Sequence, residues 1–419
     1  MSRSLQVVLI LLALSLLGLA VTGDPLYSRL AYLWVGVLTV GWLWSRFALH
    51  GIRVRRQAHR RRAQVGAMFE ERFEVTNGSR LPCPWLEVRD RSPLPGSRGS
   101  RVLIGLAGRG RRSYLVRTRL VRRGVFPLGP TEIASSDPFG LFRTAKTFPA
   151  EAALLVVPMT VRVRSFPSPS GVLPGGEALR RRTPQVTPNA VSIREYAPGD
   201  PLVRIHWPST TSQTSERGSS SNSLTMSRPC RAVDGAREVQ AALPHPSPDR
   251  YADAYRHPLA EVKLPPSTEE YAVSIAASVA RHFLDRGRAV GLVACGPSLL
   301  VIPPDRGGRQ LIKVLEALAL LRAEGEVPIW TLVDLQARQI PRGSTVVLVT
   351  PSTETEVVMA VDLLLRRALR PVVVLLDAAS FGGPEGTEAL AATVAGMGVP
   401  VRRVACGDDL GQALGQFVP

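Results

Sequence analysis

The sequence contains few lysines, few cysteines and few aromatic residues. These shortages limit the kinds of binding site that the sequence predicts. Only three of the 52 basic residues are lysines, so the formal charge of +18 is carried almost entirely by arginine. The four cysteines lie far apart without a CxxC pair, so they indicate neither a disulfide framework nor a zinc site. The one aromatic residue among the arginines of 109–123 is Tyr114, which shares the alternation of the apolar side chains of its strand and so is expected on the face opposite Arg117 and Arg119. We therefore favour a solvated basic strand face there over a nucleic-acid or lipid surface.

Motifs for nucleotide binding and for nucleophilic catalysis are also missing. The chain has no GxxxxGK(S/T) loop, so any ATP chemistry would belong to a partner. It has no GxSxG nucleophile elbow either. The alternative of a hydrolase would depend on His206 with Asp200, two residues without a recognisable nucleophile beside them. The sequence therefore favours a protein that is not an enzyme.

Two long apolar runs lie near the N-terminus, at 5–21 and about 30–49. Each is long enough to cross the hydrocarbon core of a bilayer as a helix. The residues Gly23, Asp24 and Pro25 between them permit only a tight turn. We therefore predict a transmembrane helical hairpin over residues 1–50. A cleaved signal peptide is the alternative for the first run, but the second run follows it at once.

A basic juxtamembrane segment, 51–62, follows the second run, whereas the hairpin loop offers only Arg29. The positive-inside rule then places both termini and the soluble domains in the cytoplasm, at the cell (inner or plasma) membrane. The same segment can bind anionic lipid headgroups, although a topology signal alone is the alternative. The lipid-facing candidates are Arg53, Arg55, Arg56, Arg60, Arg61 and Arg62.

Residues 63–165 show short alternating segments separated by turn residues, which is typical of strands. One such segment ends at Asn77-Gly78, a strong hairpin signal. Several strands at this spacing predict a β-sandwich of the immunoglobulin type. A later turn, expected to dock one layer on the next, consists of Asp137, Pro138, Phe139 and Gly140.

A connector at 166–208 contains a turn dipeptide flanked by charged residues. Arg204 could pair with either carboxylate of this segment, Glu195 or Asp200, so the segment can close on itself and have a structural role. A structural role is therefore predicted for Glu195, Pro198, Gly199, Asp200 and Arg204.

This segment resembles the signature of the domain of unknown function 58 family through Arg194, Tyr196, Pro198, Gly199, Asp200, Ile205 and Trp207. The resemblance implies a structural or interaction role for these residues together with Glu195 and Arg204. The apolar runs, the β domain with its turn, and the Leu173-Pro174-Gly175-Gly176 approach also resemble that family, over nearly the whole chain. The resemblance implies a bacterial or archaeal membrane-anchored protein with a C-terminal von Willebrand factor A-like domain. It further implies a MoxR-type AAA+ ATPase and other membrane proteins encoded nearby as partners, but no defined activity.

The sequence departs from that family over 209–232, a Ser/Thr-rich stretch with almost no apolar periodicity. It stands where the family has a strand leading into the A-like domain. We interpret it as a local frameshift in the gene, and a flexible linker is the alternative. If the stretch is a real linker, the A-like sheet is expected to lack its usual first strand.

The last part, 233–419, alternates helix and strand and predicts an α/β domain with a mainly parallel sheet. Strands are expected at 290–294, 345–349, 371–376 and 399–404, and helices at 271–284, 310–321, 354–369 and 387–397. Ligands usually bind at the carboxyl edge of such a sheet, which would include Asp234, Thr350 and Asp377.

The resemblance implies a comparison with A domains that hold Mg²⁺ through a DxSxS motif, a threonine and a second aspartate. Here Asp234 matches the first aspartate, but the motif serines are absent, and Pro351 follows Thr350. The sequence thus predicts no cofactor and no complete metal site, with Asp234 and Thr350 as the remaining candidate ligands. The leading hypothesis is a membrane-tethered scaffold that works with an AAA+ ATPase in the assembly or maturation of envelope or other protein complexes. The alternatives are the hydrolase and an anionic lipid or nucleic-acid binder.

Overall fold

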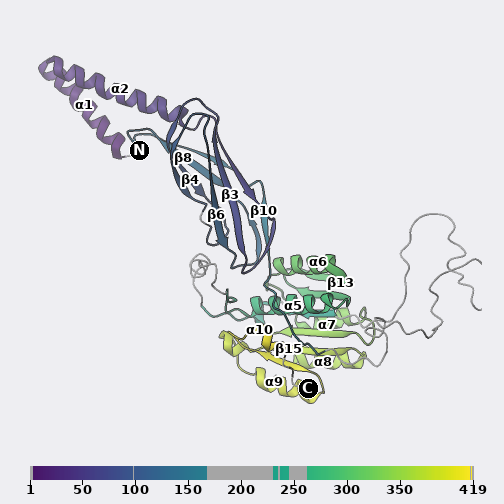
Figure 1. Ribbon diagram of the computed structural model, residues 1–419. Coiled ribbons are helices and arrows are strands. Elements are labelled where there is room, and N and C mark those ends of the chain that lie inside the picture. Colours follow the sequence, from purple (N-terminus) through teal and green to yellow (C-terminus); the bar gives the residue numbers. More distant parts are fainter. Residues whose placement is uncertain are drawn as a thin grey trace, which may run out of the picture. The chain divides into compact units, whose positions relative to one another are not determined.

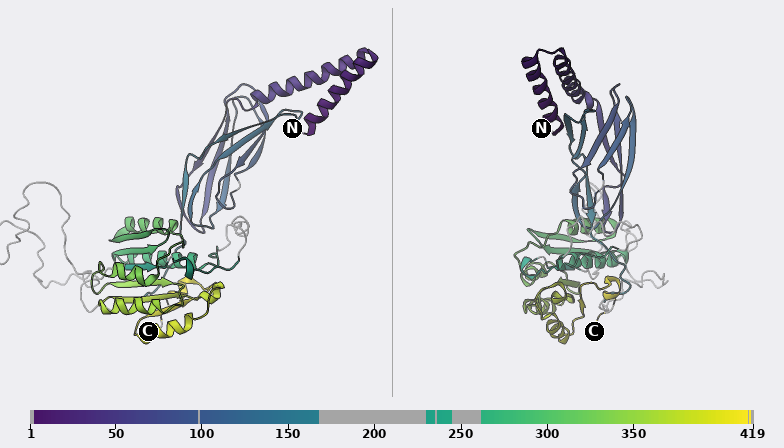
Figure 2. Two further views of the ribbon diagram at one scale, coloured as in Figure 1. Left: turned by 180° about the vertical axis from the view of Figure 1, so that it is seen from behind. Right: turned by 90° about the vertical axis from the view of Figure 1, so that its left-hand side faces the viewer.

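The computed structural model describes residues 3–97, 99–167, 230–234, 236–244, 262–415 and 417 (Figures 1 and 2). Two apolar helices are followed by a sheet-rich domain and then by a C-terminal α/β domain, which confirms the predicted order at this level. The predicted motif at 194–207, including His206, lies outside the described residues, as does most of the Ser/Thr-rich stretch.

The first two helices form an antiparallel hairpin, α1 (Arg3–Thr22) and α2 (Pro25–Ala48). Asp24 caps α2 by accepting a hydrogen bond from the Leu26 backbone N–H at 2.9 Å, and Pro25 occupies the first helical turn, where it loses no hydrogen bond. Both helices are long and apolar enough to cross a membrane. The tight turn that the sequence predicted is present.

Gly18 of α1 lets the aromatic ring of Tyr27 approach the helix backbone. A Cβ atom at Gly18 would lie 2.6 Å from two ring atoms of Tyr27, whereas a Cβ at Gly36 would meet nothing within 4 Å. We expect Gly18→Leu to push the helices apart at a cost of about 1–3 kcal/mol, the usual penalty for overpacking. Amide hydrogen exchange of the full chain in detergent should be faster in α1 and α2 of this variant. Gly36→Leu is the matched control, and equal exchange in both variants would contradict the predicted packing.

The sheet-rich domain consists mostly of antiparallel strands. One sheet has the order β1–β3–β6, formed by β1 (Ile52–Ala58), β3 (Met68–Asn77) and β6 (Arg111–Arg119). A second has the order β5–β4–β8–β9, formed by β5 (Arg101–Leu106), β4 (Cys83–Asp90), β8 (Thr131–Ser136) and β9 (Arg143–Phe148). A third has the order β2–β10–β7, formed by β2 (Arg62–Gln64), β10 (Ala153–Val157) and β7 (Gly124–Pro127).

The Asn77-Gly78 turn does not close a hairpin, so that prediction is wrong. Strands β3 and β4 on either side of it belong to different sheets. The buried Asn77 side chain holds the connection instead, because its amide donates to the carbonyl oxygens of Leu81 and Ala107 and its oxygen accepts from the Ser79 N–H. The domain also begins earlier than the predicted residue 63, since β1 starts at Ile52 in the supposed juxtamembrane segment.

The α/β domain contains a six-stranded sheet of order β13–β12–β11–β14–β15–β16. Its strands are β11 (Cys230–Val233), β12 (Val290–Cys295), β13 (Leu299–Asp305), β14 (Thr345–Thr350), β15 (Arg370–Leu376) and β16 (Val401–Val404). All neighbours are parallel except β12 and β13, which are antiparallel. The mainly parallel sheet predicted from the alternation of elements is therefore present.

Helices cover both faces of this sheet (Figure 1). Alternate residues of β12, β14 and β15 pack on one face against α5 (Thr268–Asp285), α6 (Gly307–Leu320) and α10 (Leu410–Ala413). The intervening residues pack on the other face against α7 (Ile329–Ala337), α8 (Glu356–Arg366) and α9 (Thr387–Gly396). Short 3₁₀ turns, η3 (Arg237–Val239) and η4 (Ala378–Phe381), follow β11 and β15.

Strand β11 corrects the predicted boundary at 232/233. Residues 230–232 belong to the segment predicted to be irregular, yet all three pair with β14 in the middle of the sheet, and Ala232 also pairs with β12. The sheet therefore has the strand that it was expected to lack if the Ser/Thr-rich stretch is a real linker. The strand is only four residues long, so its apolar pattern is too short to be distinguished from the preceding stretch.

One buried arginine joins the sheet-rich domain to the α/β domain. Arg123 precedes β7, and its guanidinium donates to the Glu269 carboxylate at 2.5 Å and to the Leu321 carbonyl oxygen at 2.9 Å. It also forms an ion pair with Glu270. The Arg123 side chain is 4% exposed. A second, more exposed ion pair joins Arg62 to Glu316 of α6 at 2.7 Å.

Candidate functional site

The carboxyl edge of the α/β sheet contains a switch point between β11 and β14. Strands β12 and β13 lie on one side of β11 in reverse sequence order, and β14, β15 and β16 follow in sequence order on the other side. In doubly wound sheets, ligands bind outside the carboxyl ends of the strands at this position. Asp234 directly follows β11, and Thr350 is the last residue of β14. The two residues predicted for this edge therefore meet at the switch point.

Asp234 and Thr350 are buried and hydrogen-bonded to each other. The Thr350 hydroxyl donates to Asp234 Oδ2 at 2.6 Å, and the Ala236 N–H donates to Asp234 Oδ1 at 3.0 Å. The Thr350 oxygen in turn accepts from the Ser352 N–H at 2.9 Å. Both carboxylate oxygens thus have a donor from the same chain, and the pair fixes the loops that follow β11 and β14. Asp377 follows neighbouring β15 and lies before η4, where its carbonyl oxygen accepts from the Ser380 hydroxyl at 2.6 Å.

This arrangement does not fit a metal ion of the DxSxS kind. A Mg²⁺ ion would need further oxygen ligands, and Asp234 is a buried carboxylate with a donor already on each oxygen. The positions of the two motif serines are occupied by Ala236 and Glu238. Within the described ranges, no group of three or more His, Cys, Asp and Glu side chains is placed to hold a metal. We conclude that Asp234 and Thr350 form a structural clasp.

Burial raises the pKa of Asp234, and the hydrogen bond from Thr350 offsets this shift in part. The native state then binds a proton more tightly than the unfolded chain. The contribution of Asp234 to stability is complete below its ordinary pKa of 3.8, and it is lost as the pH rises through the raised native pKa.

We therefore expect Asp234→Asn to flatten the dependence of unfolding free energy on pH above 3.8. Each unit of pKa difference between the two states corresponds to about 1.4 kcal/mol. Thr350→Val should have the opposite effect, because it removes a donor that favours the charged carboxylate, and the loss should then extend to higher pH. Denaturant titrations of the full chain across a pH series measure both effects. Parallel curves for wild type and Asp234→Asn would contradict the expectation.

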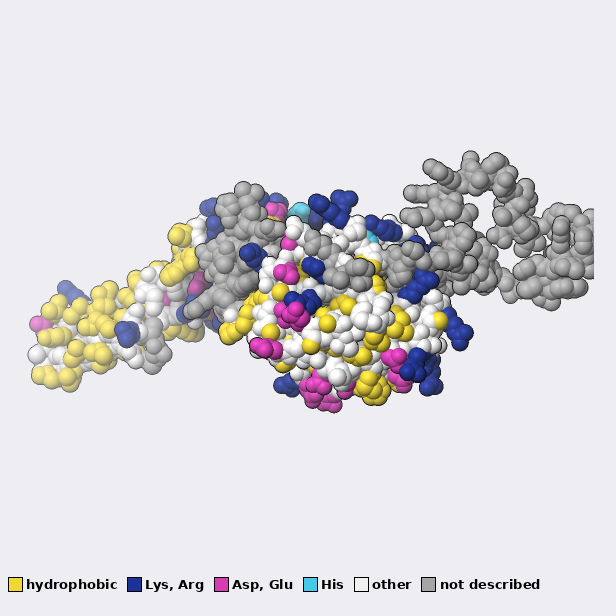
Figure 3. All heavy atoms as spheres, turned by 90° about the horizontal axis from the view of Figure 1, so that it is seen from below, with side chains coloured by type: hydrophobic (Ala, Val, Ile, Leu, Met, Phe, Trp, Pro, Cys, Tyr) yellow, Lys and Arg dark blue, Asp and Glu magenta, His cyan; other side chains and the backbone are white. Residues whose placement is uncertain are grey.

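The surface beside the clasp carries charges of both signs. Arg237 and Glu238 are exposed in η3 after β11, and Glu354 is exposed after β14. Figure 3 shows acidic and basic side chains interspersed over the face of the α/β domain drawn there, whereas hydrophobic side chains dominate the hairpin. The loops that the clasp fixes therefore present charged side chains of both signs at the switch point.

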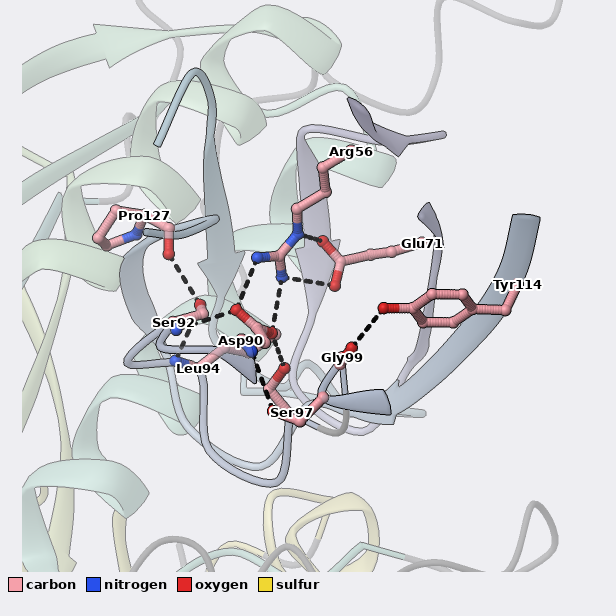
Figure 4. A network of polar contacts seen from close by, with 10 residues as sticks. Arg56, Glu71, Asp90, Ser92, Leu94, Ser97, Gly99, Tyr114 and Pro127 are labelled. Atoms are coloured by element: carbon pink, nitrogen blue, oxygen red, sulfur yellow. Dashed lines mark hydrogen bonds and ion pairs between the residues drawn. The ribbon is translucent and has the colours of Figure 1, made fainter. Parts of the chain in front are cut away.

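Arg56 does not belong with the lipid-facing arginines, so that part of the prediction is wrong. Its side chain is 9% exposed and makes a two-pronged ion pair with Glu71, with both N–O distances 2.7 Å. It also pairs with Asp90 at 2.9 Å, and it stacks on the Phe73 ring at 4.8 Å from the centroid. Figure 4 shows this network between β1, β3 and the end of β4.

Both carboxylates that pair with Arg56 are fully buried. The Glu71 and Asp90 side chains are 0% and 1% exposed. Ser97 donates to the second Asp90 oxygen at 2.5 Å, and the Ser92 N–H donates to the first at 3.0 Å. Burial raises the pKa of Glu71, although Arg56 opposes the shift. The network links two sheets and is a structural feature rather than a binding site.

The other arginines of the predicted segment lie in different places. Arg53 and Arg55 are exposed on β1, as expected of a basic surface. Arg60, Arg61 and Arg62 follow β1, which is seven residues long and so separates them from the end of α2 by about 20 Å of strand. Salt screens the attraction between these arginines and headgroups near α2 over that distance. Arg62 pairs with Glu316 instead. The continuous basic stretch was therefore misread, because a strand divides it.

The predicted turn at 137–140 lies against α2. The Asp137 carboxylate accepts from the N–H groups of Phe139 at 3.0 Å and Phe142 at 2.6 Å, which closes the turn. A Cβ atom on Gly41 of α2 would lie 3.2 Å from Asp137 Oδ2. Pro138, Phe139 and Gly140 are exposed. The turn thus docks the sheet-rich domain on a membrane-candidate helix rather than on another layer of the sandwich.

No known family model matches this chain, and no curated protein matches it either. Among solved structures, the chain is similar to a CARDB domain from Pyrococcus furiosus, crystallised in complex with di-metal ions. The identity is 13%, the match covers 25% of this chain and 91% of that domain, and the TM-score is 0.19. The interpretation of the site therefore depends on the geometry of this chain alone.

Proposed function

We propose that this chain is a membrane-anchored interaction protein of the domain of unknown function 58 family, with no catalytic role of its own. In this proposal, α1 and α2 fix it in the cell membrane with both termini in the cytoplasm. The α/β domain acts as a von Willebrand factor A-like domain that binds a MoxR-type AAA+ ATPase during the assembly or maturation of envelope or other protein complexes. The partner comes from the family resemblance.

The observation that carries the proposal is the clasp at the switch point. A ligand site would need accessible donor or acceptor atoms there, whereas Asp234 and Thr350 are buried and bonded to each other. Such a pair stabilises the edge loops and leaves the exposed side chains around it free to meet a protein surface. The sheet order, with an antiparallel β13 at one end, further supports an A-like domain.

The exposed arginines of α2 and β1 support the cytoplasmic orientation. Arg46, Arg53 and Arg55 lie at the end of the hairpin that leads into the sheet-rich domain, and Arg29 is the only basic residue near the opposite turn. This difference follows the positive-inside rule.

Affinity capture of the detergent-solubilised chain from its own cells, with ATP or a non-hydrolysable analogue, tests the proposal. We expect nucleotide-dependent recovery of an AAA+ ATPase, identified by mass spectrometry. Arg237→Glu with Glu354→Arg, beside the clasp, should reduce this recovery at least about tenfold, the effect of losing about 1.4 kcal/mol of binding energy.

Arg342→Glu provides a matched control for the capture, because Arg342 is exposed before β14, at the opposite edge of the sheet. It should leave recovery of the ATPase unchanged. Capture of the ATPase at equal levels by all variants would place the contact elsewhere. Absence of any ATPase under both nucleotide conditions would reject the proposed partner.

A further inference from the structure

Three loops of the sheet-rich domain gather around the end of α2. The Gly78 N–H donates to the Gly51 carbonyl oxygen at 2.9 Å, just after the helix. The Arg109 N–H donates to the Ser79 carbonyl oxygen at 2.8 Å, which brings the loop between β5 and β6 to the same place. The turn at 137–142 contacts α2 at Gly41. These loops form one end of the domain, which we call the α2 rim.

Large apolar side chains are exposed at this rim instead of being buried in the domain. Leu81 is 56% exposed and Phe139 is 50% exposed, each on one of the loops. Trp85 and Ile104 are directly opposite each other on β4 and β5 and are 51% and 78% exposed. Isolated exposed apolar residues are common on soluble proteins, but a group of four at one end indicates contact with an apolar phase.

Strand register places Trp85 and Ile104 level with the last turns of α2. The Ser135 hydroxyl donates to the Trp85 carbonyl oxygen at 2.7 Å, and Ser135 is opposite Thr144 in the β8–β9 pair. The Thr144 hydroxyl donates to the Ser45 carbonyl oxygen of α2 at 3.0 Å. A single row of contacts therefore runs from Trp85 to a helix that is apolar enough to cross a membrane.

Exposed arginines accompany the apolar side chains. Arg46 lies in the last turn of α2, Arg80 precedes Leu81, and Arg109 occupies the neighbouring loop. None of the three forms an ion pair with another residue in the described part of the chain. Apolar side chains with cations beside them are typical of surfaces that lie in the headgroup layer of anionic membranes.

We propose that the α2 rim lies in the headgroup layer of the bilayer that α1 and α2 enter, and that it binds anionic phospholipid. Leu81, Trp85, Ile104 and Phe139 contact the acyl boundary, and Arg46, Arg80 and Arg109 contact the phosphates. This inference depends on the membrane anchoring in the proposed function. It assigns a lipid-binding role to loops of the soluble domain, remote from the switch point.

Photo-crosslinking of the full chain tests this inference directly. A benzophenone amino acid is introduced as Phe139→p-benzoylphenylalanine or Ile104→p-benzoylphenylalanine, and each variant is reconstituted in nanodiscs of phosphatidylcholine and phosphatidylglycerol. After illumination, mass spectrometry should detect lipid adducts at both positions. Val125 is the matched control, because it is 50% exposed on β7, a strand that contacts α6 of the α/β domain. We expect no lipid adduct there.

The same probe at Leu17, an exposed residue of α1, separates the two proposals. Adducts at Leu17 without adducts at Phe139 and Ile104 would overturn the rim and leave the anchor intact. Absence of adducts at Leu17 as well would overturn the anchor itself.

Charge reversal tests the phosphate contacts. In the wild-type rim, phosphatidylglycerol should be enriched in the adducts above its share of the nanodisc lipid. The combination of Arg46→Glu, Arg80→Glu and Arg109→Glu should abolish this enrichment. An enrichment that persists in the reversed variant would refute the assignment of the phosphate contacts to these arginines.

Discussion

Arg56→Met is expected to lower the free energy of unfolding by about 3–5 kcal/mol, the usual cost of removing one partner from a buried ion pair. The variant keeps most of the apolar volume of the side chain, so the loss comes from electrostatics. It leaves Glu71 and Asp90 facing each other without a cation, at 0% and 1% exposure. Chemical denaturation of the full chain in detergent, monitored by tryptophan fluorescence, measures the change.

Arg55→Met is the matched control, because Arg55 is the preceding residue on the same strand and is exposed. Its cost should stay within about 0.5 kcal/mol, as for most surface substitutions. The double variant Arg56→Met with Glu71→Leu should recover part of the loss, since one buried carboxylate is removed with the cation. Equal stability of Arg56→Met and Arg55→Met would show that the network contributes little.

The burial of this network could have been read from strand alternation. Residues 52, 54, 56 and 58 face inward along β1, and Arg56 is the only charged one. Along β3, Glu71 stands in the same way between Phe69 and Phe73. When each of two strands has a charged residue at a position that its alternation assigns to the buried face, the two charges are expected to pair. The density of arginines around Arg56 hid this signal, because it favoured a single basic segment.

The α/β domain was easier to predict from the sequence than the sheet-rich domain. Its helices have apolar residues at helical spacing, and its central strands are continuous runs rich in β-branched residues. Each pattern can be recognised within a short stretch of sequence. The elements that were missed have a weaker pattern. Strand β13 includes Pro303 and Pro304, which a sheet tolerates there because β13 is an edge strand. Edge position depends on topology and could not be read locally.

The candidate site was predicted in part. The sequence identified Asp234 and Thr350 as residues of the same sheet edge, because each follows or ends a strand. It could not show that they bond to each other, since that contact joins residues 116 positions apart. The order of strands around β11 decides which strand ends are neighbours. For the same reason the sequence did not indicate the apolar rim, which combines three separate loops.

The second large effect is expected from Arg123→Met, again about 3–5 kcal/mol. Arg123 is buried between the two domains and faces Glu269 and Glu270 in the first turn of α5. Burial already raises the pKa of Glu270 even with the arginine beside it. Without the guanidinium, two adjacent carboxylates would remain at the joint, and the Leu321 carbonyl oxygen would lose a donor. Denaturation should therefore separate into two transitions, one for each domain.

Arg122→Met is a close control, because Arg122 is the exposed residue beside Arg123. It should retain a single transition and lose at most about 0.5 kcal/mol. Adding Glu269→Gln and Glu270→Leu to Arg123→Met should restore much of the stability, because the uncompensated charges are then gone. Recovery of stability without recovery of a single transition would show that the guanidinium joins the domains by its geometry. If Arg123→Met and Arg122→Met unfold alike, the joint depends instead on other contacts, such as those of α6 with β7 and β10.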